Sequence, residues 1–242
     1  ASRGLGDVYK RQEFMTGREV TVLAFCDGKT LLPMPASQDH KKAYDGDKGA
    51  NTGGMGAFAP TPYFSEQDKK EFLQNIALPT LKGLEKEGIV FKGVLYFGLM
   101  KTSDGLKVVE YNARFGDPET QVVLALLKSD LLEIVNAVIE GRLDCTEVLW
   151  SDETALTVVV ADGGYPDNVV KGKEIRIGDL DGVRLIHAGT KLDGGRLKTN
   201  GGRVFNVVGV AESLDKARKK VYGQIDKVGF EGARYRADIG LV

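Results

Sequence analysis

The run EYNARFGDPET at residues 110–120 constrains this chain more than any other feature. Its first half has the character of a strand. Alternate residues of a strand point to the same face of a sheet, so Glu110, Asn112 and Arg114 are expected to share one face. Carboxylate and amide oxygens suit Mg²⁺, and a guanidinium suits a phosphate or a carboxylate. The run therefore predicts a magnesium–nucleotide site. For this pattern alone, an amphipathic strand with a solvated polar face is the simpler alternative.

The second half of the run indicates the start of a helix. Asp117 stands where an N-cap is expected, Pro118 suits the first helical position, and Glu119 is favourable in the first turn. A capping role alone would account for Asp117. A strand end beside a helix N-terminus also forms a concave polar corner that binds anions, so the two interpretations are compatible.

The composition excludes several classes of protein. Among 242 residues, 33 Lys and Arg against 34 Asp and Glu give a net charge of −1, which argues against a nucleic-acid partner. No apolar stretch approaches the roughly 20 residues that a membrane-spanning helix needs, and no signal peptide is evident. The 2 cysteines lie far apart and indicate reduced thiols of a cytoplasmic protein, while the 2 histidines exclude a histidine-rich metal site.

The periodicity along the chain predicts an α+β fold. Strands are expected at residues 20–25, 30–34, 89–100 and 106–115, and helices at 65–88, 118–127 and 131–139. Ser65 with Asp68 is expected to form a capping box, and Asp130 and Ser213 are expected to start the helices that follow them. A long loop is expected at 35–62. After residue 150 the pattern changes to short strands at 155–161, 174–177, 183–188 and 203–210, followed by one helix at 214–227. This change places a domain boundary near residue 150.

The expected loop at 35–62 contains residues suited to binding. Its glycines allow backbone N–H groups to approach an anion, its lysines add positive charge, and its carboxylates can receive an amine. A mobile surface loop with solvated charges is the alternative. His40 lies in this loop without a defined role, whereas His187 alternates with apolar neighbours and is typical of a sheet residue.

A second glycine-rich turn precedes an apolar strand near the end of the chain. Gly201 and Gly202 stand directly before Arg203. A guanidinium in that position can hold a phosphomonoester through two hydrogen bonds. Taken alone, the pattern is more typical of an ordinary turn, and it is a weak signal for a phosphate site.

Together these motifs resemble the glycinamide ribonucleotide synthetase family of the ATP-grasp superfamily. The matching segments span residues 13–240 and are EFMTGREVTVLAFCDGKT, MPASQDHKKAYDGDKGANTGGMGAFAPTP, GVLYFGLM, VVEYNARFGDPETQ, KTNGGRVFNVVG and RYRADIG. The resemblance implies the C-terminal half of an ATP-grasp domain at residues 13–150, an antiparallel sheet with flanking helices. A small β-rich C-terminal domain is implied at 151–242. It also implies a cytoplasmic ligase that joins glycine to 5-phosphoribosylamine with ATP, through glycyl phosphate, in purine biosynthesis.

The resemblance further implies roles for individual residues. Glu110 and Asn112 would bind Mg²⁺ or Mn²⁺, Arg114 would steady the transferring phosphoryl group, and Asp117 and Glu119 would face the substrate amine. The residues implied around glycine and the acyl phosphate are Asp45, Lys48, Asn51, Gly53, Gly54 and Gly56. Those implied for ribose 5-phosphate are Thr199, Gly201, Gly202 and Arg203. Those implied for adenine and ribose are Glu13, Phe14, Met15 and Glu19.

Members of the family carry further domains upstream of Glu13, including the lysines that contact the phosphates of ATP. Residues 1–12 match nothing in the family and are expected to be a non-native leader. We therefore expect the chain alone to bind Mg-ATP weakly and to turn over poorly. Two alternatives stay open: another ATP-grasp carboxylate–amine ligase or carboxylase, and a non-catalytic nucleotide-binding fragment. A monomer is the working expectation, and no nucleic acid or membrane is expected as a partner.

Overall fold

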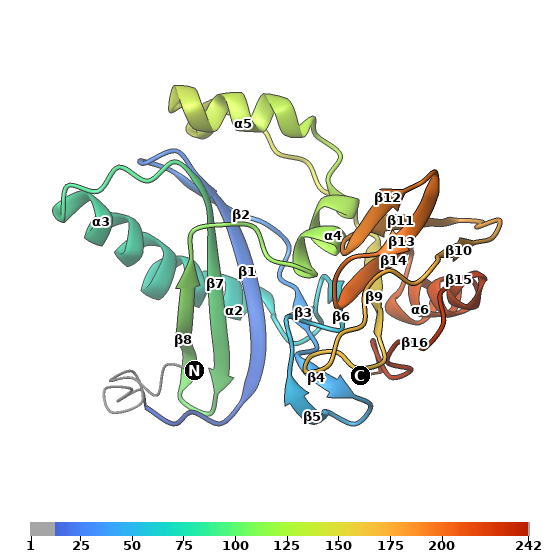
Figure 1. The fold of residues 1–242 in the computed structure, drawn as a ribbon. Coiled ribbons are helices and arrows are strands. Elements are labelled where there is room, and N and C mark those ends of the chain that lie inside the picture. The colour runs from blue at the N-terminus through green and yellow to red at the C-terminus, as the bar shows by residue number, and fades with distance from the viewer. Residues whose placement is uncertain (1–12, 242) are drawn as a thin grey trace, which may run out of the picture.

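The computed structural model describes residues 13–241, which form two larger antiparallel sheets and three two-stranded ones, with helices packed between and against the larger sheets (Figure 1). The predicted α+β class is confirmed. The leader expected at residues 1–12 lies outside the described residues. Among the described helices, none is both long enough and apolar enough to cross a membrane.

The first sheet is built from two hairpins whose inner strands pair with each other. Its strand order is β2-β1-β7-β8, and every pairing is antiparallel. The strands are β1 (Arg18–Cys26), β2 (Leu31–Pro33), β7 (Gly93–Thr102) and β8 (Gly105–Asn112). All four predicted strands of this region therefore exist, although β8 ends three residues before the predicted end at residue 115.

One face of the first sheet is covered by a continuous helical stretch. It consists of α2 (Glu66–Glu71), a π-helical segment η1 (Phe72–Ala77) and α3 (Leu78–Lys86). Ser65 and Asp68 form the predicted capping box at its start, and Gly88 follows its end with a φ of 69°. Pro79 falls in the first turn of α3, directly after the π segment, so the proline stands where the helix geometry changes.

The second sheet contains strands from both ends of the chain. Its order is β11-β14-β9-β6-β3, with β16 also paired to β9. The strands are β3 (Gln38–Asp39), β6 (Gly56–Ala59), β9 (Thr154–Asp162), β11 (Val183–His187), β14 (Arg203–Ala211) and β16 (Ala233–Arg234). The domain boundary near residue 150 stays a prediction, and β6 and β9 pair across it.

The prediction of a long loop at residues 35–62 is wrong. That region forms β3 and β6 together with a hairpin of β4 (Lys42–Tyr44) and β5 (Lys48–Asn51). These strands are short, between two and four residues each, so they carry no clear period-2 pattern. β6 pairs with β9, and β3 pairs with β6, so tertiary pairing supplies the stability that local sequence preference does not.

The remaining elements all follow β8 in the chain. They are α4 (Glu119–Val123), η2 (Leu124–Leu126), α5 (Leu131–Glu140), η3 (Leu143–Cys145), β10 (Arg176–Ile177), β12 (Thr190–Asp193), β13 (Arg196–Thr199), α6 (Leu214–Tyr222), η4 (Ile225–Lys227) and β15 (Val228–Gly229). The predicted helix at 118–127 is shorter than expected and ends as a 3-10 turn. Asp130 and Ser213 cap α5 and α6 as predicted.

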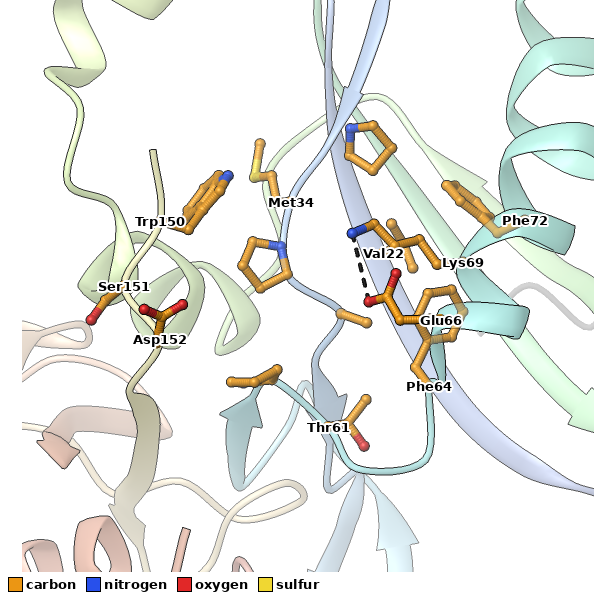
Figure 2. A pocket seen from close by; sticks show the side chains of 14 residues that line it. Val22, Met34, Thr61, Phe64, Glu66, Lys69, Phe72, Trp150, Ser151 and Asp152 are labelled. Carbon is orange, nitrogen blue, oxygen red and sulfur yellow. Dashed lines mark ion pairs between the residues drawn. The ribbon is translucent and has the colours of Figure 1, made fainter. Parts of the chain in front are cut away.

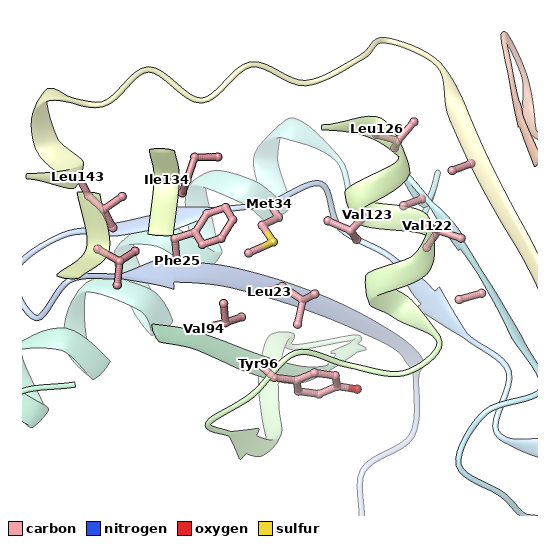
Figure 3. Packing of buried hydrophobic residues seen from close by; sticks show 14 of the residues in the cluster. Leu23, Phe25, Met34, Val94, Tyr96, Val122, Val123, Leu126, Ile134 and Leu143 are labelled. Carbon is pink, nitrogen blue, oxygen red and sulfur yellow. The ribbon is translucent and has the colours of Figure 1, made fainter. Parts of the chain in front are cut away.

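A shared hydrophobic core holds α4 between the two sheets (Figure 3). Leu23 and Tyr96 come from the first sheet, Val122 and Val123 from α4, and Ala155 from the second sheet. All five side chains are less than 5% exposed. Because α4 directly follows the run at residues 110–118, this packing fixes that run against the second sheet.

Candidate functional site

A shift in the pairing of β7 and β8 determines to which face of the sheet the side chain of Glu110 points. Gly98 of β7 pairs with Glu110, but the next residue, Leu99, pairs with Val108, so β8 contains one extra residue here. Val108 packs beside α2 and α3. Regular alternation would turn Glu110 to that same side, whereas the extra residue turns it to the opposite face. Asn112, two residues further, shares the face of Glu110.

Glu110 and Asn112 are joined by a hydrogen bond on this face. The amide Nδ2 of Asn112 donates to Oε1 of Glu110 at 3.2 Å. The pair offers oxygen donors of the kind that Mg²⁺ prefers. Within residues 13–241, no cluster of three or more His, Cys, Asp and Glu side chains is arranged to hold a metal ion. A cation at this pair would therefore complete its shell with water and substrate oxygens, as Mg²⁺ commonly does.

Arg114 does not lie on the strand as expected, because β8 ends at Asn112. The arginine stands in the turn that follows. Its guanidinium donates to the carbonyl oxygen of Phe115 at 2.8 Å and lies 5.9 Å from the ring centroid of Tyr96. Because Tyr96 pairs with Asn112 across the sheet, the cation of Arg114 lies at the edge of the same face.

A buried acidic cluster lies between α4 and the first sheet. Glu119 is 3% exposed, and its Oε1 accepts hydrogen bonds from the hydroxyls of Tyr96 at 2.8 Å and Thr21 at 3.4 Å. Oδ1 of Asp39 is buried nearby without a hydrogen-bond partner among the described residues. Burial, and then the charge of Glu119, raise the pKa of Asp39 well above its ordinary value. The charges of Lys41 and Arg203 offset this effect only in part.

Lys41 is influenced by charges of both the acidic cluster and the Glu110–Asn112 pair. Its ammonium lies 2.6 Å from the carboxylate of Glu19. Burial alone would lower the pKa of Lys41, but the hydrogen bond to Glu19 and the charges of Asp39 and Glu110 outweigh burial and raise it. The lysine thus stays charged, with its ammonium paired to Glu19.

A polar cavity of about 590 Å³ opens beside Lys41. Its walls include Glu19, Asp39, His40, Asp47 and Asn51. This volume lies within the usual range of small-molecule sites. His40 is 9% exposed, and burial, then the charge of Arg236, lower its pKa, so its imidazole is neutral at physiological pH.

Asp117 does not cap α4 as predicted, because the helix begins one residue later with Pro118 as its N-cap. Its carboxylate instead forms a two-point pair with Arg203, in which Nη1–Oδ1 is 3.3 Å and Nη2–Oδ2 is 3.2 Å. A bidentate, charge-assisted pair of this kind is stronger than a hydrogen bond to a backbone N–H. Gln121 also donates to Asp117 at 2.9 Å.

Arg203 also binds the glycine turn that follows β5. Its Nη1 donates to the carbonyl oxygen of Gly53 at 2.8 Å. Gly54 has a φ of +110°, and a Cβ there would lie 2.4 Å from Pro118 and 2.6 Å from Asp39. Only glycine fits this crowded position without displacing its neighbours. The turn after β5, the turn before α4 and the start of β14 therefore meet at one point.

The four residues expected to hold ribose 5-phosphate do not all reach that point. The Thr199 hydroxyl accepts a hydrogen bond from the backbone N–H of Lys173 at 3.1 Å, and Gly201 packs against Gly189. Gly202 packs against the ring of Tyr165, where a Cβ would lie 2.2 Å from the ring. Arg203 is the residue of this group that contacts Gly53 and Asp117.

The residues expected around glycine also lie in different parts of the structure. Asn51 lines the polar cavity, and Lys48 is exposed on β5. Asp45 accepts a hydrogen bond from the backbone N–H of Ala237 at 2.9 Å, which ties it to the end of the chain. Gly56 is buried in β6, where a Cβ would lie 2.7 Å from a backbone oxygen of β9.

The residues expected at adenine and ribose lie near the open edge of the first sheet. Lys107 donates to Glu13 at 2.8 Å, and Glu19 pairs with Lys41. Phe14 is 90% exposed and Met15 is partly exposed. An aromatic ring this accessible is available for stacking on a base.

Four site residues received no role from the sequence: Thr21, Asp39, Lys41 and Tyr96. Asp39 and Lys41 belong to the expected loop at residues 35–62, which the sequence had already indicated as suited to binding. Their position in that segment is the signal that could have identified them. Thr21 and Tyr96 are polar groups inside apolar strands, and their hydroxyl oxygens lie 3.0 Å apart. Buried hydroxyls in such strands need partners, which is the one signal that points to them.

A second cavity, of about 400 Å³, lies between β2, α2 and residues 150–152 (Figure 2). Trp150 and Met34 line one side, and Lys69 and Glu66, whose charged groups are 3.8 Å apart, line another. The predicted site residues are not among those that line it.

Comparison with known proteins identifies two matching family models. The phosphoribosylglycinamide synthetase ATP-grasp (A) domain matches residues 11–120, and the C domain of the same synthetase matches residues 155–242.

Curated relatives match nearly the whole chain. A phosphoribosylamine–glycine ligase of Caldanaerobacter subterraneus is 46% identical over 97% of this chain and 56% of the relative. One of Brucella melitensis is 46% identical over 95% of this chain and 55% of the relative. A trifunctional purine biosynthetic protein of Gallus gallus is 46% identical over 97% of this chain and 24% of the relative. The chain thus spans about 56% of the length of the first of these relatives.

Solved structures give the same result at the level of the fold. The crystal structure of a phosphoribosylamine–glycine ligase from Thermotoga maritima superposes with a TM-score of 0.87 at 38% identity, over 94% of this chain and 57% of that chain. A biotin carboxylase domain from Hydrogenobacter thermophilus superposes with a TM-score of 0.66 at 11% identity, over 93% of this chain and 48% of that chain. At that identity only the fold is shared.

Proposed function

The chain belongs to the phosphoribosylglycinamide synthetase family, and we propose that it carries the metal-binding and substrate-binding part of a cytoplasmic, ATP-dependent phosphoribosylamine–glycine ligase. The reaction joins the carboxyl carbon of glycine to the amine of 5-phosphoribosylamine at the expense of ATP. The observation that best supports this role is that Tyr96 links the two groups: it pairs with Asn112 across the sheet and donates to the buried Glu119, so the Glu110–Asn112 pair lies beside the acidic cluster of Asp39 and Glu119.

Glu110 and Asn112 would hold the divalent metal. Their two oxygen-bearing side chains suit a hard cation, and Mg²⁺ is favoured because it keeps several water and phosphate ligands. When bound, the metal supplies positive charge that offsets the phosphates of ATP. Arg114, at the edge of the same face, would add a fixed cation where the transferring phosphoryl group passes.

Asp39 and Glu119 would receive the ammonium group of glycine. Two buried carboxyl groups that repel each other are stabilised when a cation enters between them. Tyr96 and Thr21 hold Glu119 in a fixed orientation, so the ammonium would meet a preorganised acceptor. The carboxylate of glycine would then attack the γ-phosphorus of ATP, and ADP would leave.

Arg203 would hold the phosphate of 5-phosphoribosylamine. Its guanidinium is paired with Asp117, and a phosphate would take the place of that carboxylate. The amine would attack the carbonyl carbon of glycyl phosphate, phosphate would leave, and a nearby carboxylate would accept the proton. Asp117, once released, and Glu119 are the candidates for this step.

Substrate-dependent formation of ADP tests this proposal. The chain is supplied with Mg-ATP and 5-phosphoribosylamine, and glycine is compared with bicarbonate and formate. Incorporation of radiolabelled glycine into glycinamide ribonucleotide detects slow turnover. We expect the label to be incorporated, and Asp39→Asn with Glu119→Gln to abolish it. Glu133→Gln, at an exposed position on α5, is the matched control. Turnover that depends on bicarbonate or formate and not on glycine would contradict the proposal.

A further inference from the structure

Arg236 is the largest fully buried side chain of the described part of the chain, although arginine is seldom buried completely. It is 1% exposed and lies in the segment that follows β16. A buried guanidinium is stable only when its donors find partners. The identity of those partners therefore indicates what the residue does.

The partners of Arg236 lie on the β4–β5 hairpin and on its own segment. Nη1 donates to the carbonyl oxygen of Lys42 at 3.0 Å and to Oδ1 of Asp47 at 2.9 Å. Nε and Nη2 each donate to a carboxylate oxygen of Asp238 at 2.7 Å. Lys42 and Asp47 both line the polar cavity of the candidate site. One side chain thus joins the end of the chain to two residues of the cavity wall.

Further bonds along the same segment hold the turn of the hairpin. Oδ2 of Asp238 accepts from the backbone N–H of Gly46 at 2.8 Å, and the backbone N–H of Ala237 donates to Asp45 at 2.9 Å. Arg234 lies with its guanidinium carbon 4.8 Å from the ring centroid of Tyr44. The hairpin is therefore fastened from outside, because its own pairing is short and irregular.

The hairpin separates two parts of the candidate site. Asp39, His40 and Lys41 precede β4, and Gly53 and Gly54 follow β5. A displacement of the hairpin would shift both parts. Errors of about 1 Å in such positions cost large factors in binding and catalysis.

We propose that Arg236 is a positioning residue, which fastens the β4–β5 hairpin so that the residues flanking it form the glycine-binding wall of the cavity. The inference rests on the proposed function for the identity of the ligand, whereas the fastening itself does not. Arg236 contacts no substrate. It acts through Lys42 and Asp47.

The test compares Arg236→Lys with Arg196→Lys in the 242-residue chain. Lysine keeps the charge but cannot bond to Lys42, Asp47 and Asp238 together. Arg196 carries the same substitution on an exposed side chain of β13, where its partner is Glu174. Hydrogen–deuterium exchange of residues 42–51 measures the fastening, and titrations with glycine and with Mg-ATP measure binding.

We expect Arg236→Lys to raise exchange at residues 42–51 and to weaken glycine binding at least tenfold, while Mg-ATP affinity stays within about twofold. Arg196→Lys should change none of these. Equal weakening of both ligands, or glycine affinity that is unchanged despite faster exchange, would overturn the proposal. Asp47→Asn keeps the arginine and should give the same pattern more weakly if Arg236→Lys does not fold. A chain that binds no glycine before substitution would contradict the proposed function, and the exchange result would still decide whether the hairpin is fastened.

Discussion

The guanidinium of Arg203 grips the carboxylate of Asp117, with Nη2 and Oδ2 separated by 3.2 Å. The same guanidinium donates to the backbone oxygen of Asp117 at 2.8 Å and to that of Gly53 at 2.8 Å. The side chain of Arg203 is 20% exposed, so the pair lies at an accessible surface of the site. Under the proposed function, a phosphate would take the position that the carboxylate of Asp117 occupies.

Because the carboxylate of Asp117 would compete with a phosphate for Arg203, substitutions of these two residues should change phosphate affinity in opposite directions. Asp117→Asn removes the negative charge and should strengthen binding of ribose 5-phosphate. Arg203→Ala removes a charge-assisted, bidentate donor worth about 1.5–3 kcal/mol, so binding should weaken roughly 10- to 100-fold. Titration calorimetry with ribose 5-phosphate measures both. Weaker binding in Asp117→Asn would show that Asp117 assists the phosphate instead of standing in for it.

Glu110→Gln should abolish metal-dependent nucleotide binding with little change in stability. The substitution keeps the size of the side chain and removes the charge that attracts the cation. Glu110 is exposed, so its loss leaves no buried group without a partner. Binding of Mn²⁺ in the presence of ATP, followed by electron paramagnetic resonance, reports the effect, and urea unfolding reports stability. A variant that binds Mn²⁺-ATP as tightly as the unaltered chain would remove Glu110 from the metal site.

Gly54→Ala should disrupt the point where three segments of the site meet. A methyl group there would stand 2.4 Å from Pro118, and the φ of +110° is unfavourable for alanine. We expect a loss of more than about 1 kcal/mol in the free energy of unfolding. Gly83→Ala is the control, because no atom lies within 4 Å of the added methyl in α3, and it should stabilise the chain by up to about 1 kcal/mol. If both variants unfolded at similar urea concentrations, the inference that Gly54 is too crowded for a side chain would be wrong.

The raised pKa of Asp39 predicts how stability depends on pH. Its causes are burial and then the charge of Glu119. A carboxyl group with a raised pKa in the folded state binds its proton more tightly there than in the unfolded chain. Its contribution to stability is therefore lost as pH rises from about 4 towards the folded pKa. Asp39→Asn cannot ionise, so its stability should exceed that of the unaltered chain at neutral pH and the difference should shrink towards pH ~4.

Asp238→Asn should change stability at neutral pH in the opposite direction to Asp39→Asn. Burial would raise the pKa of Asp238, but the hydrogen bonds from Arg236 and Gly46, together with the charge of Arg236, outweigh burial and lower the pKa. A lowered pKa contributes stability above the ordinary value of about 3.9, which is lost as pH falls through the folded pKa. Urea unfolding between pH 4 and 8 should therefore find this variant less stable than the unaltered chain at neutral pH. The account fails if the two variants change stability in the same direction at pH 7.

Local signals in the sequence predicted local structure. The capping box of Ser65 and Asp68 and the N-caps Asp130 and Ser213 are all present, because each depends on contacts within one turn. The hairpin that carries Glu110 and Asn112 was also predictable from its turn residues. The short strand β6 was not, because its stability comes from pairing with β9, which lies far along the chain.

Two features of the site depend on tertiary contacts that no local pattern shows. The extra residue in β8 sets the face of Glu110, and it is visible only once the register with β7 is known. Asp117 resembled a helix cap because the competing partner, Arg203, lies in a separate part of the sequence. The acidic cluster of Asp39 and Glu119 likewise forms only when α4 packs between the sheets.

The central claim is that Glu110 and Asn112 hold the metal that accompanies ATP. A crystal structure of the chain with Mn²⁺ and a non-hydrolysable ATP analogue, with the metal located by anomalous scattering, tests it most directly. We predict Mn²⁺ bound to the carboxylate of Glu110 and the amide oxygen of Asn112. A metal peak elsewhere, with both side chains turned away from the nucleotide, would contradict the account.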